Sequence, residues 1–153
     1  MTAHGAPQAL FKGRVYFGDT DAAGVVYHGR YVYWLEAARI ELLEALGCPY
    51  TLFQADKIGF IPVHLEIDYH SPLKFSDTFI IHSELTDISK ASFVVESLIK
   101  NASGQLICKA KVKLACLDET KWKPRPLPEV LLKKLKIQKL LYFGEDFSQK
   151  KYS

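Results

Sequence analysis

The hydrophobic period of this sequence changes between residues 31 and 63, and that change restricts the fold more than any other feature. Apolar residues first recur every three or four positions, at Tyr31, Leu35, Ala38, Leu42, Ala45 and Leu46. This spacing predicts one long amphipathic helix. Gly47 and Pro49 follow it directly, and both residue types are typical of a helix end.

After Gly59 the period becomes two, which is typical of β-strands. Val63, Leu65, Ile67 and Tyr69 alternate with polar residues and predict a strand with one buried face. Other strands are expected from the same kind of pattern, at 11–17, 78–88, 92–100 and 105–117. Weaker helical patterns lie at 50–57 and 129–141.

This order of elements predicts an α+β fold. Consecutive strands with short links form antiparallel sheets, and the single long helix must cover one face of the sheet. We therefore expect the hotdog fold, a curled antiparallel sheet of about five strands around one long helix. Residues 1–130 are assigned to a single domain, and residues 131–153 to a basic C-terminal helix or tail. One helix leaves part of the sheet uncovered, so we expect self-association through the sheet.

Composition excludes several broad classes. The chain has 153 residues, 48% of them hydrophobic and 24% charged, an ordinary globular balance. No apolar run approaches the roughly eighteen residues of a membrane helix, and the first residues lack the pattern of a signal peptide. We therefore expect a cytoplasmic protein that is not integral to a membrane.

Charge is unevenly distributed along the chain. Residues 1–120 carry 11 Lys and Arg against 14 Asp and Glu, whereas residues 121–153 carry 9 against 3. A basic tail suits nucleic acid, a membrane surface or the phosphates of a ligand, and is also an ordinary solvated face. The aromatic residues mostly occupy apolar periodic positions, which favours core packing over base stacking, so no nucleic-acid partner is expected.

The loop before the long helix holds the densest group of reactive residues. Asp19 and Asp21 stand two positions apart, Gly24 permits unusual backbone angles, and His28 precedes the helix. The N–H groups of a helix start can stabilise an oxyanion, and a nearby carboxylate can activate water or attack directly. Aspartates before a helix are also common capping and turn residues, so the loop alone leaves both interpretations open.

A longer motif extends this loop. It runs Tyr16-Phe-Gly-Asp-Thr-Asp-Ala-Ala-Gly-Val-Val-Tyr-His-Gly-Arg-Tyr31 and is followed by Glu36 and Arg39. This segment resembles the 4-hydroxybenzoyl-CoA thioesterase family, and especially its YbgC branch, whose pattern is DTDxxGVVYHxxY followed by ExxR. The likeness covers roughly residues 11–130. It implies a hotdog homodimer or homotetramer that hydrolyses acyl-CoA to acid and CoA, without a metal or a redox cofactor.

The resemblance also implies roles for individual residues. It selects Asp21 as the catalytic nucleophile or general base, and it makes Asp19 structural. The backbone N–H that polarises the thioester oxygen falls at His28, whose imidazole would assist Asp21 or orient water. The family's CoA-binding hairpin corresponds to Lys90 and Ser92, and Arg125 is a further candidate for the phosphates.

The acyl group stays open at this point, between small aliphatic and aromatic groups. Val63-His64 is similar to the strand start of 1,4-dihydroxy-2-naphthoyl-CoA hydrolases of the phylloquinone and menaquinone route. There His64 would bond a phenolic hydroxyl; alternatively, it points to solvent on the outer face of its strand. Acyl carrier protein is a further partner to consider. The alternative to an enzyme is a non-catalytic hotdog module that binds acyl-CoA or acyl carrier protein, and the Asp21 carboxylate favours the enzyme.

Overall fold

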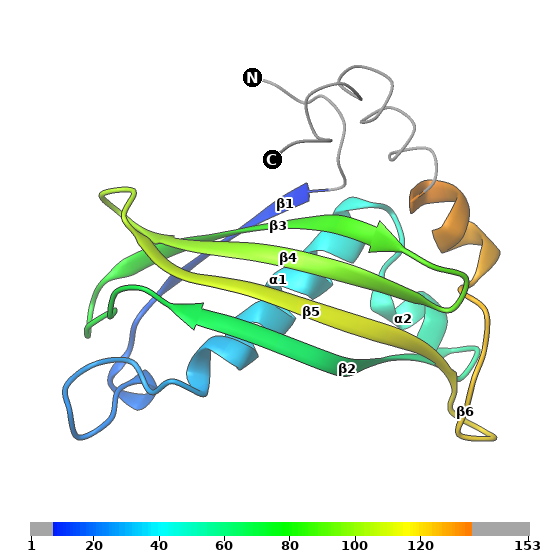
Figure 1. Ribbon diagram of the computed structural model, residues 1–153, viewed down its shortest axis with the longest axis horizontal. Helices are drawn as coiled ribbons and strands as arrows, with labels where there is room; N and C mark the ends of the chain where they lie inside the picture. The colour runs from blue at the N-terminus through cyan, green and yellow to red at the C-terminus, as the bar shows by residue number, and fades with distance from the viewer. Residues whose placement is uncertain (1–7, 136–153) are drawn as a thin grey trace, which may run out of the picture.

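The computed structural model describes residues 8–135, which form one sheet and a set of helices (Figure 1). The helical elements are the 3₁₀ turn η1 (Phe17–Asp19), α1 (Arg30–Ala45) and α2 (Tyr50–Gln54), with a further helical segment at 129–135. The strands are β1 (Gln8–Arg14), β2 (Ile58–Tyr69), β3 (Thr78–Ile88), β4 (Ser92–Asn101), β5 (Leu106–Asp118) and β6 (Lys123–Pro124).

Five of these strands make up the body of the sheet. They pair in the order β1-β3-β4-β5-β2, every pairing is antiparallel, and β6 pairs with the end of β5. β1 and β2 are therefore the two edges of the sheet. Short turns join β3 to β4 and β4 to β5, as the sequence predicted.

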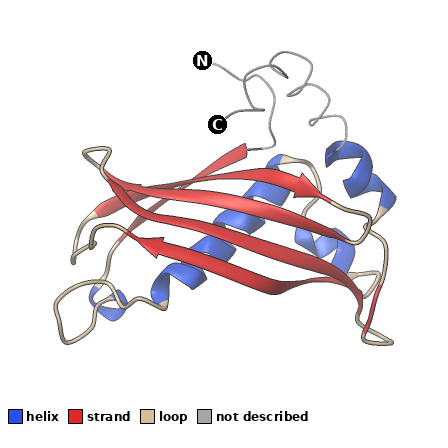
Figure 2. Cartoon of the chain, viewed as in Figure 1, coloured by secondary structure: helices blue, strands red, loops and turns tan. Residues whose placement is uncertain are grey.

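The long helix α1 crosses one face of the sheet (Figure 2). Leu35, Ala38 and Leu42 of the predicted apolar stripe are buried, together with Trp34, whereas Ala45 is exposed. Trp34 packs against Phe79 of β3, with ring centroids 4.3 Å apart. The contacts of α1 concentrate on β1 and β3, so the helix covers one half of the face better than the other. The predicted α+β arrangement, one long helix on an antiparallel sheet, is confirmed.

β5 shows most clearly how the sequence pattern becomes a strand. The buried residues Cys108, Ala110, Val112, Leu114 and Cys116 alternate with the exposed lysines 109, 111 and 113. The helix-facing side of β5 is therefore apolar, and its outer side is charged. This alternation agrees with the prediction for residues 105–117.

Three predicted segments differ from the structure. The first strand begins at Gln8 and ends at Arg14, rather than spanning 11–17, and the chain then turns into η1. β2 begins at Ile58, before its alternation starts, since Ile58, Gly59 and Phe60 are all buried. Residues 123–124 stay beside the sheet as β6, whereas the sequence suggested that this stretch leaves it.

The predicted buried face of β2 is wrong for a single chain. Leu65 pairs with Val112 and Tyr69 pairs with Cys108, so both lie on the helix side of the sheet. Their side chains are nevertheless 41% and 51% exposed, and Val63 is 58% exposed. α1 contacts mainly β1 and β3, and of these three residues only Tyr69 is shown in contact with it, through Tyr31. The alternation correctly identified the apolar face, but within residues 8–135 only Ile67 of its four predicted residues is half-buried against the core.

The segment after β6 packs onto the core. Leu127, Leu131 and Leu135 are buried in the same cluster as Leu43 and Phe53. Lys133 and Lys134 lie on the exposed side of the helical segment 129–135. The rest of the predicted helix, residues 136–141, lies outside the described residues.

No helix found between residues 8 and 135 combines the length and apolar content needed to cross a bilayer.

Gly13 of β1 should be required for the packing of β1 on β3. A methyl group at this position would lie 2.4 Å from the buried ring of Phe79. We expect Gly13→Ala to lower the free energy of unfolding by about 1–3 kcal/mol, the usual cost of overpacking, measured by urea denaturation. Gly18→Ala is the matched control, because a methyl group there meets nothing within 4 Å. Equal stability of the two variants would mean that the packing does not require a glycine at residue 13.

Candidate active site

The loop between β1 and α1 is held against the end of the sheet by backbone hydrogen bonds. The Val15 N–H donates to Asp77 O and the Val26 N–H donates to Leu73 O, both at about the usual distance (2.8 and 2.9 Å). Short antiparallel bridges join Thr20 to Val26 and Val25 to Lys74. Gly24 has a φ of 79°, which glycine adopts without strain. The loop therefore has a defined shape, although most of its side chains are exposed.

Asp19 is a structural residue of this loop. Its carboxylate is buried, accepts the Tyr16 N–H at 2.8 Å and accepts Arg30 Nε at 2.6 Å. Its carbonyl oxygen accepts the Tyr27 N–H at 2.9 Å. Asp19 thus ties the start of the loop to its end and to the first residue of α1.

Asp21 has the opposite environment. Its side chain is exposed, and Oδ1 accepts the Ala23 N–H at 2.8 Å. No side chain or backbone group of residues 8–135 donates to Oδ2. The backbone of Asp21 is fixed by its N–H to Val25 O and by its carbonyl to the Gly24 N–H, both at 3.0 Å. The carboxylate is therefore oriented through one oxygen and accessible through the other.

His28 lies at the entrance of α1. Gly29 is the N-cap and Arg30 the first helical residue, so His28 precedes the helix itself by two positions. The His28 carbonyl accepts the Tyr69 hydroxyl at 2.8 Å, which joins the helix entrance to the end of β2. Its N–H has no acceptor among the residues that the structure describes. It is thus an available donor near the positive end of α1.

A shallow pocket of about 270 Å³ opens beside His28. Its other lining residues include Val26, Tyr31, Tyr69 and His70. Burial raises the pKa of Tyr31 to about 12 and also raises the pKa of Tyr69, so both phenols stay protonated near neutral pH. Neither tyrosine was predicted as a site residue, because alternation and helical spacing identify residues 31 and 69 only as apolar positions. Nothing in their spacing indicated that residues 31 and 69 would meet, with ring centroids 5.5 Å apart.

The predicted CoA-binding residues gather at the other end of the sheet. Lys90 lies in the β3–β4 turn and Ser92 begins β4. The Lys90 carbonyl accepts the Leu127 N–H at 2.9 Å, which brings the turn near Arg125. Ser92 is level with Ala115, which is level with Ile61 of β2. Ile61 precedes Tyr69 by eight strand residues, about 26 Å. Within one chain, these residues are therefore remote from Asp21 and His28 (Figure 1).

His64 lies on the outer face of the sheet. It pairs with Lys113, one of the exposed lysines of β5, and its ring nitrogen Nε2 is 2.7 Å from Glu66 Oε1. The imidazole therefore points away from the pocket beside His28. This position matches the solvent-facing alternative for His64.

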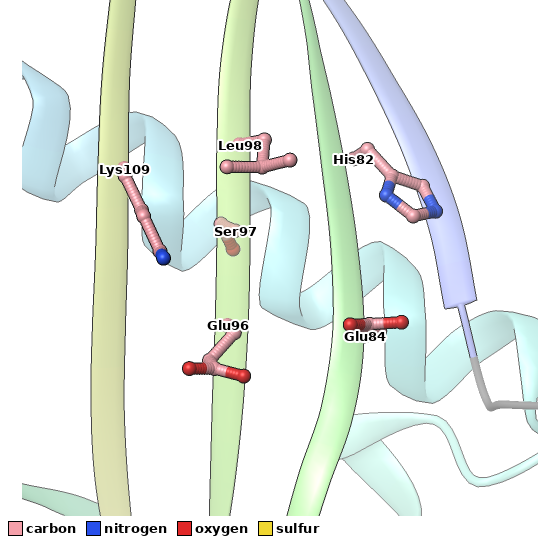
Figure 3. Close-up of a pocket in the computed structure, with 6 residues that line it drawn as sticks. All are labelled: His82, Glu84, Glu96, Ser97, Leu98 and Lys109. Carbon is pink, nitrogen blue, oxygen red and sulfur yellow. The ribbon is translucent and has the colours of Figure 1, made fainter. Parts of the chain in front are cut away.

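A second hollow, of about 200 Å³, also lies on the outer face (Figure 3). Glu84 and Glu96 are directly opposite each other in the β3–β4 register, and His82, Leu98 and Lys109 surround them. These residues are on the side of the sheet away from α1. The hollow therefore shares no residue with the loop that carries Asp21 and His28.

The chain is similar to proteins of a known family. The family model described as the thioesterase-like superfamily matches residues 15–135. The acyl-CoA thioester hydrolase YbgC of Escherichia coli O6:H1 is 36% identical over 123 residues, which is 80% of this chain and 92% of that protein. The 1,4-dihydroxy-2-naphthoyl-CoA hydrolase of Synechococcus elongatus is 33% identical and covers 79% of this chain and 90% of its own length.

Solved structures share the fold. The DHNA-CoA thioesterase from Staphylococcus aureus superposes with a TM-score of 0.84 at 24% identity, over 90% of this chain and 95% of that one. The chain belongs to the thioesterase-like superfamily. The predicted hotdog fold, the resemblance to the 4-hydroxybenzoyl-CoA thioesterase family and the enzyme class, thioester hydrolase, are confirmed.

Asp19 and Asp21 should contribute differently to the stability of the protein. We expect Asp19→Ala to lower the free energy of unfolding by about 2 kcal/mol, because it leaves the Tyr16 N–H and Arg30 without their acceptor. Asp21→Ala should change it by less than about 0.5 kcal/mol, as is usual for an exposed side chain. Urea denaturation followed by circular dichroism measures both. A greater loss in Asp21→Ala than in Asp19→Ala would make Asp21, and not Asp19, the structural residue of the loop.

Proposed function

We propose that this chain hydrolyses the thioester bond of a small acyl-CoA, with Asp21 as the nucleophile or general base. The observation that carries the proposal is that one loop holds both an accessible carboxylate, on Asp21, and an available backbone donor, at His28. Asp21 Oδ2 has no donor and the His28 N–H no acceptor among residues 8–135, and loop bonds hold both groups in place. The YbgC relative at 36% identity supports an acyl-CoA substrate.

In the reaction, the thioester oxygen accepts the His28 N–H at the entrance of α1. This donor and the positive end of the helix stabilise the oxyanion as the carbonyl carbon becomes tetrahedral. As a general base, Asp21 takes a proton from the attacking water. As a nucleophile, it forms an acyl anhydride, which water then cleaves. In either case the C–S bond breaks, the CoA thiolate takes up a proton, and the free acid is released.

Tyr69 has a positioning role in this proposal. Its hydroxyl donates to the His28 carbonyl, which fixes the peptide that leads into α1. The His28 imidazole lies 4.5 Å from the Tyr27 ring and is exposed. In this proposal it orients the attacking water. The backbone donor survives substitution of the His28 side chain, which makes the imidazole an auxiliary group.

A dimer through β2 would unite the two ends of the site. β2 is an edge strand, so a second chain can extend the sheet by antiparallel pairing of β2 with β2. A two-fold axis at Leu65 places the partner's Ile61 level with Tyr69. It therefore brings the partner's Lys90, the partner's Ser92 and the partner's Arg125 toward Asp21 and His28. One acyl-CoA would then meet the catalytic loop of one chain and the phosphate-binding residues of the other.

The acyl group is the part that a substrate panel decides. His64 is turned to the outer face, which removes the main structural reason for a phenolic acyl group. A relative at 33% identity nevertheless is a 1,4-dihydroxy-2-naphthoyl-CoA hydrolase, so the panel includes both classes. Acetyl-, hexanoyl-, palmitoyl-, benzoyl- and dihydroxynaphthoyl-CoA are compared by the release of free thiol.

Asp21→Asn should lose at least about a hundredfold in kcat on the best substrate of that panel, because the amide neither attacks nor accepts a proton. His28→Ala should lose less, since its backbone N–H remains. Glu41→Gln, an exposed carboxylate on α1 outside the site, is the matched control and should retain wild-type turnover. Near-normal turnover of Asp21→Asn would sink the assignment. Binding of acyl-CoA by the wild type without hydrolysis would favour the non-catalytic binding module instead.

The phosphate-binding residues are tested with two forms of one substrate. In Lys90→Ala/Arg125→Ala, we expect KM for the acyl-CoA to rise about tenfold or more, because charge-assisted bonds to phosphate are lost. KM for the same acyl group on N-acetylcysteamine, which has no phosphate, should not change. Lys100→Ala, an exposed lysine at the other end of the sheet, is the control. Equal effects on both substrates would show that these residues do not recognise CoA.

A further inference from the structure

A groove of about 540 Å³ lies between β1, the start of β3 and the start of α1, and the proposed reaction does not use it. The pocket beside His28 has about 270 Å³, and the two share no lining residue. Pockets for small molecules usually enclose about 300–1,000 Å³ and have mostly apolar and aromatic walls. The groove therefore has a suitable volume for a small ligand, and its lining determines which ligand fits.

Aromatic side chains form much of the wall of this groove. Trp34 and Phe79 are buried, and their ring centroids lie 4.3 Å apart. Tyr16 and Tyr33 also line the groove, but 65% and 60% of these two residues are exposed. Folding of residues 8–135 thus leaves two large aromatic side chains in water beside two buried ones. A planar apolar ligand would cover the exposed rings.

Arg30 is a cation that the structure holds in place in this groove. Its Nε donates to Asp19 Oδ1 at 2.6 Å, and its guanidinium carbon lies 4.8 Å from the centre of the Tyr33 ring. The two terminal nitrogens have no acceptor among residues 8–135, and 41% of the side chain is exposed. A guanidinium donates in a planar fork that matches the two oxygens of a carboxylate. Arg30 therefore offers an oriented pair of donors to a ligand.

The other charged residues of the groove favour an anion as well. Lys12 and Arg14 line it, are exposed, and form no ion pair within residues 8–135. Among the described lining residues Asp19 is the only acid, and its carboxylate already accepts the Tyr16 N–H and Arg30 Nε. Three cations therefore line the groove with one carboxylate that is already paired. Such a balance raises the local concentration of small anions.

The groove is connected to the proposed catalytic loop through Asp19. β1 and the start of α1 both join this loop (Figure 1). Asp19 binds Arg30 through its carboxylate and accepts the Tyr27 N–H through its carbonyl at 2.9 Å. A ligand on the terminal nitrogens of Arg30 leaves the bond from Nε to Asp19 intact. It would therefore stabilise the folded loop without occupying the pocket beside His28.

We propose that this groove binds a small aromatic carboxylate. The carboxylate accepts hydrogen bonds from the terminal nitrogens of Arg30, and the ring packs against Tyr33 and Trp34. An aliphatic acid would supply only the first of these contacts, and inorganic phosphate would supply no ring. The site uses neither Asp21 nor the His28 N–H, so it does not rest on the proposed hydrolysis.

Isothermal titration calorimetry with 2-naphthoate tests the site. We expect 2-naphthoate to bind the wild type, and hexanoate and inorganic phosphate to bind at least about tenfold more weakly. Arg30→Gln should weaken the binding of 2-naphthoate at least about tenfold, because charge-assisted hydrogen bonds are lost. Lys121→Gln removes an equal charge from the turn between β5 and β6, and it should bind like the wild type.

Tyr33→Ala is the second test, because Arg30→Gln also removes the partner of Asp19 and destabilises the loop. Tyr33→Ala keeps the bond between Arg30 and Asp19. It should weaken the binding of 2-naphthoate about fivefold, since one aromatic wall is lost. Trp122→Ala removes an aromatic side chain of similar exposure outside the groove, and it should bind like the wild type.

Two further variants separate this groove from the proposed catalytic site. Asp21→Asn and His28→Ala should both bind 2-naphthoate like the wild type. Loss of binding in these two variants, with Tyr33→Ala unaffected, would place the ligand beside His28 and overturn the proposal. Absence of binding to the wild type, or equal binding of hexanoate, would overturn it too. Hydrolysis is measured separately by the release of free thiol, so failure of either proposal leaves the other standing.

Discussion

A single long helix cannot cover one whole face of a five-stranded sheet, and the rest of this molecule depends on that limit. α1 packs mainly on β1 and β3, where Trp34 meets Phe79. The helix-facing side of β2 is left with exposed Leu65 and Tyr69. The edge strand β2 and the entrance of α1 both border this uncovered half. It is therefore where the proposed chemistry and the proposed self-association converge.

The loop before α1 shows how neighbouring residues of one type take different roles. The Asp19 carboxylate is buried and accepts hydrogen bonds from the Tyr16 N–H and Arg30 Nε, so both of its oxygens are occupied by contacts within the loop and α1. Asp21 is held through one oxygen and keeps the other accessible. The difference comes from the loop's path, which turns the first aspartate toward Arg30 and the second toward solvent. A loop held by hydrogen bonds, with one available carboxylate, suits hydrolysis, because the catalytic group needs little further ordering when the substrate binds.

The positions of the basic residues also depend on how two chains pair. The cations proposed for CoA, Lys90 and Arg125, lie about 26 Å along the sheet from the level of Tyr69 in one chain. Antiparallel pairing of β2 shortens that separation by using the partner's residues. The register of this pairing matters, because a shifted strand would move the phosphate-binding residues away from the thioester. Specificity for one dimer would thus be part of the design of the site.

The sequence by itself determined the elements and their order, because helical and strand periods are local properties of side chains. It also singled out Asp21 and His28, through a long ordered motif. Tertiary structure decided what local patterns do not contain: the exposure of Leu65, the meeting of Tyr31 with Tyr69, and the distance from Lys90 to Asp21. Alternation shows which face of β2 is apolar, but not whether anything covers it. Cover depends on where α1 crosses the sheet, and that is set by packing between residues far apart in the chain.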